Sequence, residues 1–310
     1  KKKKKQRNGT GDHILVNSVR GGTGTGPSAT NLNILYPYGA FAESTNVGSN
    51  YIPSIQNNGF RIGTSSYVNT SGNTYVAWCL KAGGAAVANN VGTTTSQVSV
   101  NNTLGFSIVS YTGAGVVNVG HGLSSSPDLI ISKITNAGTD WVVYNSFSGT
   151  GKYLFLNSSA SIATDAGVFP SVTNSTFTQE WSGNSYQYIN YCFTSKPGFS
   201  KVGSYTGSGA AGKIIQTGFK PEFLMIKRTD GTGDWNMWDD KRGDGSIVWA
   251  NGSNAEASST NYQIDFLSNG FVLQFAWDWG NASGNNYIYL AFAADPSTTT
   301  PSLANSFFFF

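Results

Sequence analysis

The chain has 310 residues, of which 11% are charged, 14% are aromatic and 38 are glycine. This composition excludes a disordered chain, which would combine few aromatic residues with high charge, and it is typical of an all-β protein with many turns. The formal net charge is +3, but Lys1 to Lys5 and Arg7 lie at one end; the remaining 13 basic and 16 acidic residues leave −3, which argues against a nucleic-acid-binding surface.

The first part of the chain with strand signals is 8–80. Residues 14–19 (Ile-Leu-Val-Asn-Ser-Val) are expected to form a strand before a Gly-Gly turn, and residues 74–80 a second, closing strand. Residues 81–104 are small and polar and are expected to form a linker, within which residues 97–100 have the composition of a short strand.

Two segments, 105–198 and 199–297, repeat each other. Four anchors recur at one offset of 94 residues: Tyr111 and Tyr205, Pro127 and Pro221, Lys133 and Lys227, Trp141 and Trp235. Short apolar runs separated by Gly and Asn turns predict tandem antiparallel β-sandwiches of the jelly-roll kind, with central strands buried on both faces.

Residues 8–80 match only the second half of this repeat. Asp12-His13 corresponds to Asp234-Trp235, Ala42-Glu43 to Ala255-Glu256, and Gly59-Phe60 to Gly270-Phe271. The missing front half has two explanations: the chain is a piece of a longer protein, or the structural unit is permuted relative to the sequence repeat.

The two cysteines hold one place in different copies. Aligning the closing motifs at an offset of 101 residues places Ala293 opposite Cys192 and Cys79, and puts a net insertion of seven residues in the last copy. Equivalent positions in tandem domains are too far apart for a disulfide, so both cysteines are expected to be thiols buried beside Trp78 and Tyr191.

Both ends of the chain are set apart from the fold. The run Lys1 to Lys5 is interpreted as a tag or a solvated end rather than a basic arm, and 298–310, with Phe307 to Phe310, as a C-terminal tail. No signal peptide and no apolar run of about 20 residues is visible, so no membrane insertion is expected.

No catalytic constellation is found. His121 lies in a Gly-His-Gly turn, two histidines and two separated cysteines exclude a common zinc site, and the cluster Asp239, Asp240 and Asp244 has no counterpart in the other copies. We therefore expect neither an enzyme nor a cofactor.

The candidate ligand-binding residues are aromatic. Trp277 and Trp279 flank Asp278 and are expected on one face of a strand, where exposed rings would stack on sugars; the alternative is that they belong to the sandwich core.

Long motifs of the chain resemble repeats in tail-fibre-like virion structural proteins of marine tailed bacteriophages of the cyanophage type. These motifs are Gly-Phe-Ser-Ile-Val-Ser-Tyr-Thr-Gly at 105–113, Tyr-Val-Ala-Trp-Cys-Leu-Lys-Ala-Gly-Gly at 75–84, and Gly-Phe-Lys-Pro-Glu-Phe-Leu-Met-Ile-Lys at 218–227. The resemblance covers about residues 11–297.

The resemblance implies a virion component that is tail-fibre-like or decorates the capsid and takes part in host surface attachment. The partners expected are further copies of the chain in a homo-oligomer, with a trimer favoured, other virion proteins, and a host surface glycan. A glycan-cleaving tailspike enzyme and a cellular surface adhesin are the alternatives.

Overall fold

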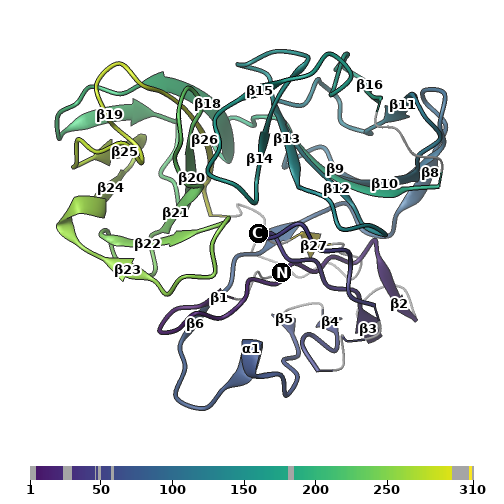
Figure 1. The fold of residues 1–310 in the computed structure, drawn as a ribbon, viewed down its shortest axis with the longest axis horizontal. Helices are drawn as coiled ribbons and strands as arrows, with labels where there is room; N and C mark the ends of the chain where they lie inside the picture. The colour runs from purple at the N-terminus through teal and green to yellow at the C-terminus, as the bar shows by residue number, and fades with distance from the viewer. Residues whose placement is uncertain are drawn as a thin grey trace.

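The computed structural model describes residues 5–23, 30–45, 47, 50–56, 59–180, 185–294 and 307–308. Three units surround a common centre (Figure 1). We call residues 5–81 unit 1, residues 87–193 unit 2 and residues 200–292 unit 3. The described chain is almost entirely β-structure, which confirms the predicted all-β class.

Unit 2 is a two-layer sandwich. Its large sheet has eight strands in the order β15-β14-β13-β12-β17-β10-β9-β8, and β11 and β16 form a small second sheet. The bounds are β8 (Val87–Asn89), β9 (Ser96–Asn101), β10 (Phe106–Thr112), β11 (Val117–Gly120), β12 (Leu129–Ile134), β13 (Val142–Asn145), β14 (Lys152–Phe155), β15 (Ala163–Thr164), β16 (Thr176–Gln179) and β17 (Gln187–Phe193).

Unit 3 repeats this plan. Its large sheet has the order β18-β26-β20-β21-β22-β23, and its small sheet the order β19-β25-β24. The bounds are β18 (Ser200–Thr206), β19 (Lys213–Gln216), β20 (Phe223–Arg228), β21 (Asn236–Asp239), β22 (Ser246–Trp249), β23 (Ala257–Ser258), η1 (Thr260–Tyr262), β24 (Ile264–Leu267), β25 (Gly270–Leu273) and β26 (Asn286–Phe292).

Residues 81–104 are not only a linker, as the composition suggested. β8 and β9 extend the large sheet of unit 2 beyond β10, with Val98 opposite Val109. Strands at a sheet edge are half exposed, so alternating valines suffice to hold them and the intervening residues can be small and polar.

Unit 1 has less regular structure than the other two units. Its strand pairs nevertheless join residues that correspond to the paired residues of unit 2. Its elements are β1 (Lys5–Gln6), β2 (Gly21–Thr23), β3 (Thr30–Leu32), β4 (Ile55–Gln56), β5 (Gly59–Phe60), α1 (Ser66–Asn69), β6 (Tyr75–Val76) and β7 (Leu80–Lys81). β1 pairs with β6 as β12 pairs with β17. The bridge between Leu15 and Leu35 stands where β13 pairs with β14.

The strand register corrects the alignment of the closing strands. Cys192 lies opposite Ile130, and Ala291 lies opposite the corresponding Leu224, so the counterpart of Cys192 is Ala291 and not Ala293. A slip of two residues leaves every side chain on the same face of a strand, so the apolar pattern could not distinguish the two alignments. The connection from β25 to β26 in unit 3 is residues 274–285, and the corresponding connection from β16 to β17 in unit 2 is residues 180–186. The first is longer by five residues (12 against 7), so the insertion in unit 3 is five residues and not seven.

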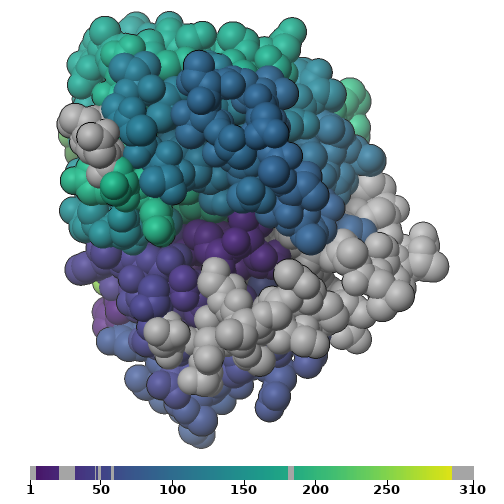
Figure 2. Space-filling model, turned by 90° about the vertical axis from the view of Figure 1, so that its right-hand side faces the viewer, coloured from purple at the N-terminus to yellow at the C-terminus, as the bar shows by residue number. Residues whose placement is uncertain are grey.

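The three units share one central core, to which the large sheets of units 2 and 3 each contribute one face. Ile14 of unit 1, Ile131 of unit 2 and Met225 of unit 3 belong to a single buried cluster, while the two sandwiches have separate cores between their layers. The large sheets are therefore covered on both faces, and all six residues of β12 are buried. On the face shown in Figure 2, unit 1 lies directly against unit 2.

Three equivalent backbone hydrogen bonds close the units into a ring. The seams join units 1 and 2 (first), 2 and 3 (second), and 3 and 1 (third). In them Glu43 N donates to Thr135 O at 2.7 Å, Ile162 N to Thr229 O at 2.9 Å, and Glu256 N to Arg7 O at 2.8 Å. Unit 1 donates to unit 2, unit 2 to unit 3, and unit 3 to unit 1. A single chain therefore forms a closed ring with approximate threefold symmetry.

Tryptophan indoles reinforce two of the seams. Trp141 Nε1 donates to Tyr36 O at 3.0 Å in the first seam, and Trp235 Nε1 donates to Phe155 O at 2.8 Å in the second. In the third seam His13 stands at the equivalent sequence position and is fully buried.

Each unit also buries one lysine at the same place. Lys5, Lys133 and Lys227 all have zero side-chain exposure. Lys133 Nζ donates to Ile134 O at 2.7 Å and to Thr139 O at 2.9 Å. Lys5 and Arg7, which the sequence reading placed outside the fold, are therefore structural, and Arg7 pairs with Glu256 at 2.7 Å. Lys1 to Lys4 lie outside the described residues.

These lysines predict that stability rises with pH above about 8. Burial lowers the pKa of Lys5, Lys133 and Lys227 from 10.5 to about 8. Between these two values the unfolded chain binds more protons than the folded one, so the free energy of unfolding increases with pH. Burial raises the pKa of Tyr188 and Tyr289 to about 12, so the trend reverses once unfolded tyrosines ionise near pH 10.

Urea unfolding at a series of pH values measures this effect. Between pH 8 and 9.5, Lys133→Met should lower the slope of the unfolding free energy against pH by about a third. The reason is that one of the three buried lysines is lost. A stability that is flat or falling over this interval in the unsubstituted chain would contradict the assignment.

Candidate functional site

The candidate glycan-binding residues lie in a turn, not in a strand as predicted. The backbone N–H of Asn281 donates to Trp277 O at 2.8 Å, which closes the turn directly after β25. The Trp277 and Trp279 rings nevertheless share one side, stacked with centroids 5.7 Å apart and 25° between planes. Trp277 is 52% exposed, so it is not part of the sandwich core.

Four aromatic rings continue from this turn across unit 3. Tyr262 lies 5.2 Å from Trp279, and Trp249 lies 6.5 Å from Tyr262, as measured between ring centroids. We call Trp249, Tyr262, Trp279 and Trp277 the aromatic platform. Trp277 is the exposed end of the platform, and the other three rings are partly buried.

Two buried side chains and one partly buried side chain fix the backbone of the turn at three consecutive carbonyls. Tyr287 Oη donates to Asp278 O at 2.9 Å, Asn236 Nδ2 to Trp279 O at 2.7 Å, and Tyr205 Oη to Gly280 O at 2.6 Å. The donors come from β26, β21 and β18, so the large sheet sets the position of the platform. Such support holds the rings ready for a ligand and lowers the entropy lost on binding.

Asp278 adds a polar group beside the rings. Its side chain is 72% exposed and lies 3.7 Å from Arg228 Nη1, which also bonds Asp230. An exposed carboxylate next to a flat aromatic face offers a hydrogen-bond acceptor to a hydroxyl-rich ligand. The turn lies within the five-residue insertion of unit 3, and the corresponding residues 181–184 of unit 2 lie outside the described residues.

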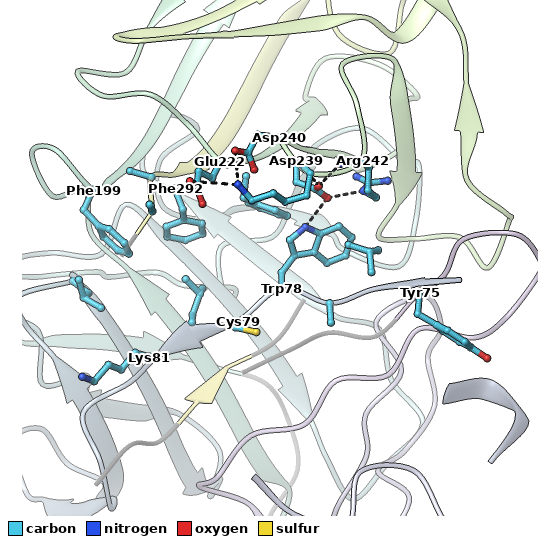
Figure 3. Close-up of a pocket in the computed structure, with 18 of the residues that line it drawn as sticks. Tyr75, Trp78, Cys79, Lys81, Phe199, Glu222, Asp239, Asp240, Arg242 and Phe292 are labelled. Atoms are coloured by element: carbon cyan, nitrogen blue, oxygen red, sulfur yellow. Dashed lines mark hydrogen bonds and ion pairs between the residues drawn. The ribbon is translucent and has the colours of Figure 1, made fainter. Parts of the chain in front are cut away.

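A second candidate is a cavity at the third seam, with a volume of about 440 Å³ (Figure 3). Trp78 projects from unit 1, and its indole Nε1 donates to Asp239 Oδ2 of unit 3 at 2.9 Å. Phe199 and Phe292 lie on the opposite side of the cavity in this view. The sequence motifs predicted no function for these residues.

The acidic cluster beside this cavity is neutralised. Arg242 Nε lies 2.5 Å from Asp239 Oδ2, while the backbone N–H groups of Lys241 and Arg242 donate to Asp239 Oδ1. Asp240 pairs with Lys241 at 2.8 Å. These partners make Asp239 the buried counter-ion of Arg242.

His121 lies in the loop directly after β11, where the sequence predicted a turn. It is fully buried, its Nδ1 accepts from the Leu123 backbone N–H at 3.1 Å, and its Nε2 lies 3.2 Å from Thr173 O. Burial lowers the pKa of its imidazole. In the described part of the chain, no group of three or more His, Cys, Asp or Glu side chains is placed to hold a metal ion.

No helix within the described ranges is long and apolar enough to cross a membrane.

Fold and site together define a single-chain ring of three β-units that carries an exposed aromatic platform on its third unit. Residues 3–296 match the model of a family described as Domain of unknown function (DUF7483), and the chain belongs to this family. No curated protein and no solved structure matches the chain.

The two cysteines should differ in reactivity. Neither is in a disulfide. Cys79 lines the third-seam cavity and is partly exposed, which corrects the expectation that it is buried, whereas Cys192 is fully buried and burial raises the pKa of its thiol to about 12. We expect a chromogenic disulfide reagent to label Cys79 in the folded protein and both thiols in urea. Cys79→Ser should abolish the native-state reaction; unchanged labelling of that variant would contradict the assignment.

Proposed function

We propose that the protein is a structural component of a tailed-phage virion, tail-fibre-like or capsid-decorating, that contacts a host surface glycan through the aromatic platform. The exposed, braced Trp277 carries this proposal. A solvent-facing indole of this size loses apolar hydration when it is covered, and its flat face suits the apolar face of a sugar ring. The resemblance to phage repeats supports the virion setting.

The platform provides the two elements that glycan recognition requires. Trp277 and Trp279 supply stacked rings, and Asp278, with the adjacent Arg228, supplies polar groups for hydroxyls. Because side chains of the large sheet hold three carbonyls of the turn, few new conformational restraints are needed on binding. A weak site of this kind becomes effective when many copies act together on one particle.

A glycan-cleaving tailspike is the main alternative. Such an enzyme needs two carboxyl groups about 5 to 10 Å apart across a groove. Asp239 is committed to Arg242 and Trp78, and Asp240 to Lys241, so this cluster favours the binding role. A cellular adhesin is the second alternative. If the proposal is correct, the genes next to that of this protein should encode other virion proteins, which is not expected for an adhesin.

Removing the exposed ring should weaken glycan binding without loss of stability. We expect Trp277→Ala to reduce the affinity for a bacterial surface oligosaccharide by about fivefold or more, since a stacking contact with one aromatic ring contributes about 1 kcal/mol or more. Binding is measured by calorimetry on ligands found in a panel of lipopolysaccharide and capsular oligosaccharides.

Phe147→Ala is the matched control, because Phe147 in unit 2 is 51% exposed and lies outside the platform. It should bind as the unsubstituted chain does. Equal affinity of the Trp277→Ala variant and the control would rule out the platform as the binding site.

The proposed assembly is a homo-oligomer, with a trimer favoured, held in the particle by other virion proteins. Exposed apolar side chains such as Val87, Val116 and Ile214, at 63%, 63% and 55% exposure, are available for contacts between copies. Light scattering should report three copies at micromolar concentration. A stable monomer would contradict this assembly. The threefold arrangement of the protein would then be only the ring of three units within one chain.

A further inference from the structure

The two candidate sites differ in what borders them. At the third-seam cavity the chain's own strand β27 (Phe307–Phe308) pairs with β7, with Phe308 opposite Leu80. The terminal phenylalanines, predicted to be a tail, therefore belong to the fold of unit 1. The aromatic platform ends instead in the exposed ring of Trp277, and the charged groups around this ring decide which ligand fits it.

Trp277 is followed by a carboxylate that faces solvent. The Asp278 side chain is 72% exposed, and its one ion pair in the described part of the chain is with Arg228. Arg228 Nη1 lies 3.7 Å from Asp278 Oδ2, which is longer than a hydrogen bond. Asp278 is therefore only loosely paired, and its charge acts on a group that lies next to the ring.

Arg228 is held by a different carboxylate. Its Nε donates to Asp230 Oδ1 at 2.9 Å, and this hydrogen bond raises the pKa of the guanidinium. The guanidinium also packs against the backbone, since a Cβ added at Gly231 would meet Arg228 Cζ at 2.5 Å. Asp230 is fixed in turn by Asn286, whose backbone N–H donates to Asp230 Oδ2 at 2.8 Å. Arg228 and Asp230 therefore neutralise each other.

Two further charged side chains lie near the turn, one of each sign. Lys213 Nζ lies over the ring of Tyr205, 6.0 Å from its centroid. Asp265 accepts hydrogen bonds from the side-chain amides of Gln263 and Gln274. Among these groups the carboxylates outnumber the cations, so the potential at the exposed ring is negative.

The backbone holds the ring and the carboxylate in a fixed relation. Tyr287 Oη donates to Asp278 O at 2.9 Å. Gly280 lies so close to Phe275 that a Cβ there would meet the Phe275 ring at 3.0 Å. Because the turn is packed in this way, a ligand that covers Trp277 also meets Asp278.

An exposed indole beside a loosely paired carboxylate suits an ammonium group. The face of an aromatic ring is negative, and Trp attracts a cation more strongly than the other aromatic side chains. An uncharged sugar gains neither this contact nor an ion pair with Asp278. A sugar that carries a carboxylate or a phosphate is repelled by the same charge.

We infer that the ligand of the platform is an amino sugar with a free amine, whose ammonium lies between the Trp277 ring and the Asp278 carboxylate. The apolar face of the sugar stacks on the same indole, as in the proposed glycan-binding function on which this inference rests. Arg228 does not compete for Asp278, because Asp230 holds it. The platform thus selects free amines over N-acetylated sugars, and these over acidic sugars.

Three trisaccharides of matched size test this selection on the intact protein: β-linked glucosamine, its N-acetylated form and galacturonate. Calorimetry at about pH 6 and low ionic strength keeps both the amines and the carboxylates charged. We expect glucosamine to bind about tenfold more tightly than its N-acetylated form, because an exposed cation–π contact and an exposed ion pair each contribute a few-fold. Galacturonate should bind most weakly.

Asp278→Asn separates the two contributions. It should reduce the preference for the amine to about threefold, the share of the cation–π contact with Trp277. Trp277→Ala should weaken the binding of both neutral and amino trisaccharides. Glu180→Gln is the matched control, because it removes an exposed carboxylate of unit 2, outside the platform, and it should leave the preference unchanged.

Equal affinity for the amino and N-acetylated trisaccharides, with Trp277→Ala still weakening both, would overturn the amino-sugar assignment and leave the glycan site in place. Tighter binding of galacturonate, or a preference that Asp278→Asn does not reduce, would overturn it as well. If Trp277→Ala changes no affinity, or if no oligosaccharide binds, the glycan-binding function itself fails and the inference fails with it.

Discussion

The fold depends on closure of the ring: the large sheets of units 2 and 3 can bury their second faces only where they meet each other and unit 1. Apolar residues of units 1, 2 and 3 form one central cluster, and the amides of Glu43, Ile162 and Glu256 each donate to the next unit in the same direction. Unit 1 has no sandwich of its own among the described residues, so its short strands rely on the shared core. Closure therefore converts three unequal copies into one structure.

Ring closure also explains why certain residues are identical in the repeats that form units 2 and 3. Lys227 Nζ donates to Ser159 O of unit 2 across the second seam, and Trp141 and Trp235 bond the backbone of the preceding unit. These residues are among the anchors of the 94-residue repeat. A residue that serves both its own sheet and the next unit has two sets of neighbours to satisfy, and few other side chains fit both.

Much of the architecture could be predicted from the sequence, because continuous apolar runs such as Leu129–Ile134 specify strands buried on both faces. The buried place of Lys5 could not be predicted, since a run of lysines is usually exposed to solvent and only the packing of the three units covers this one. The closing strand was misaligned by two residues because such a slip preserves the face of every side chain. The platform residues were identified, but a turn rather than a strand brings Trp277 and Trp279 together.

Amide hydrogen exchange of the three seam donors tests ring closure most directly. If the units form one cooperative structure, the N–H groups of Glu43, Ile162 and Glu256 exchange only through a shared opening, with free energies within about 1 kcal/mol of one another. They should also respond together to added urea. Exchange of Glu43 and Glu256 at a much lower free energy than Ile162 would show that unit 1 opens by itself, and would contradict the closed ring.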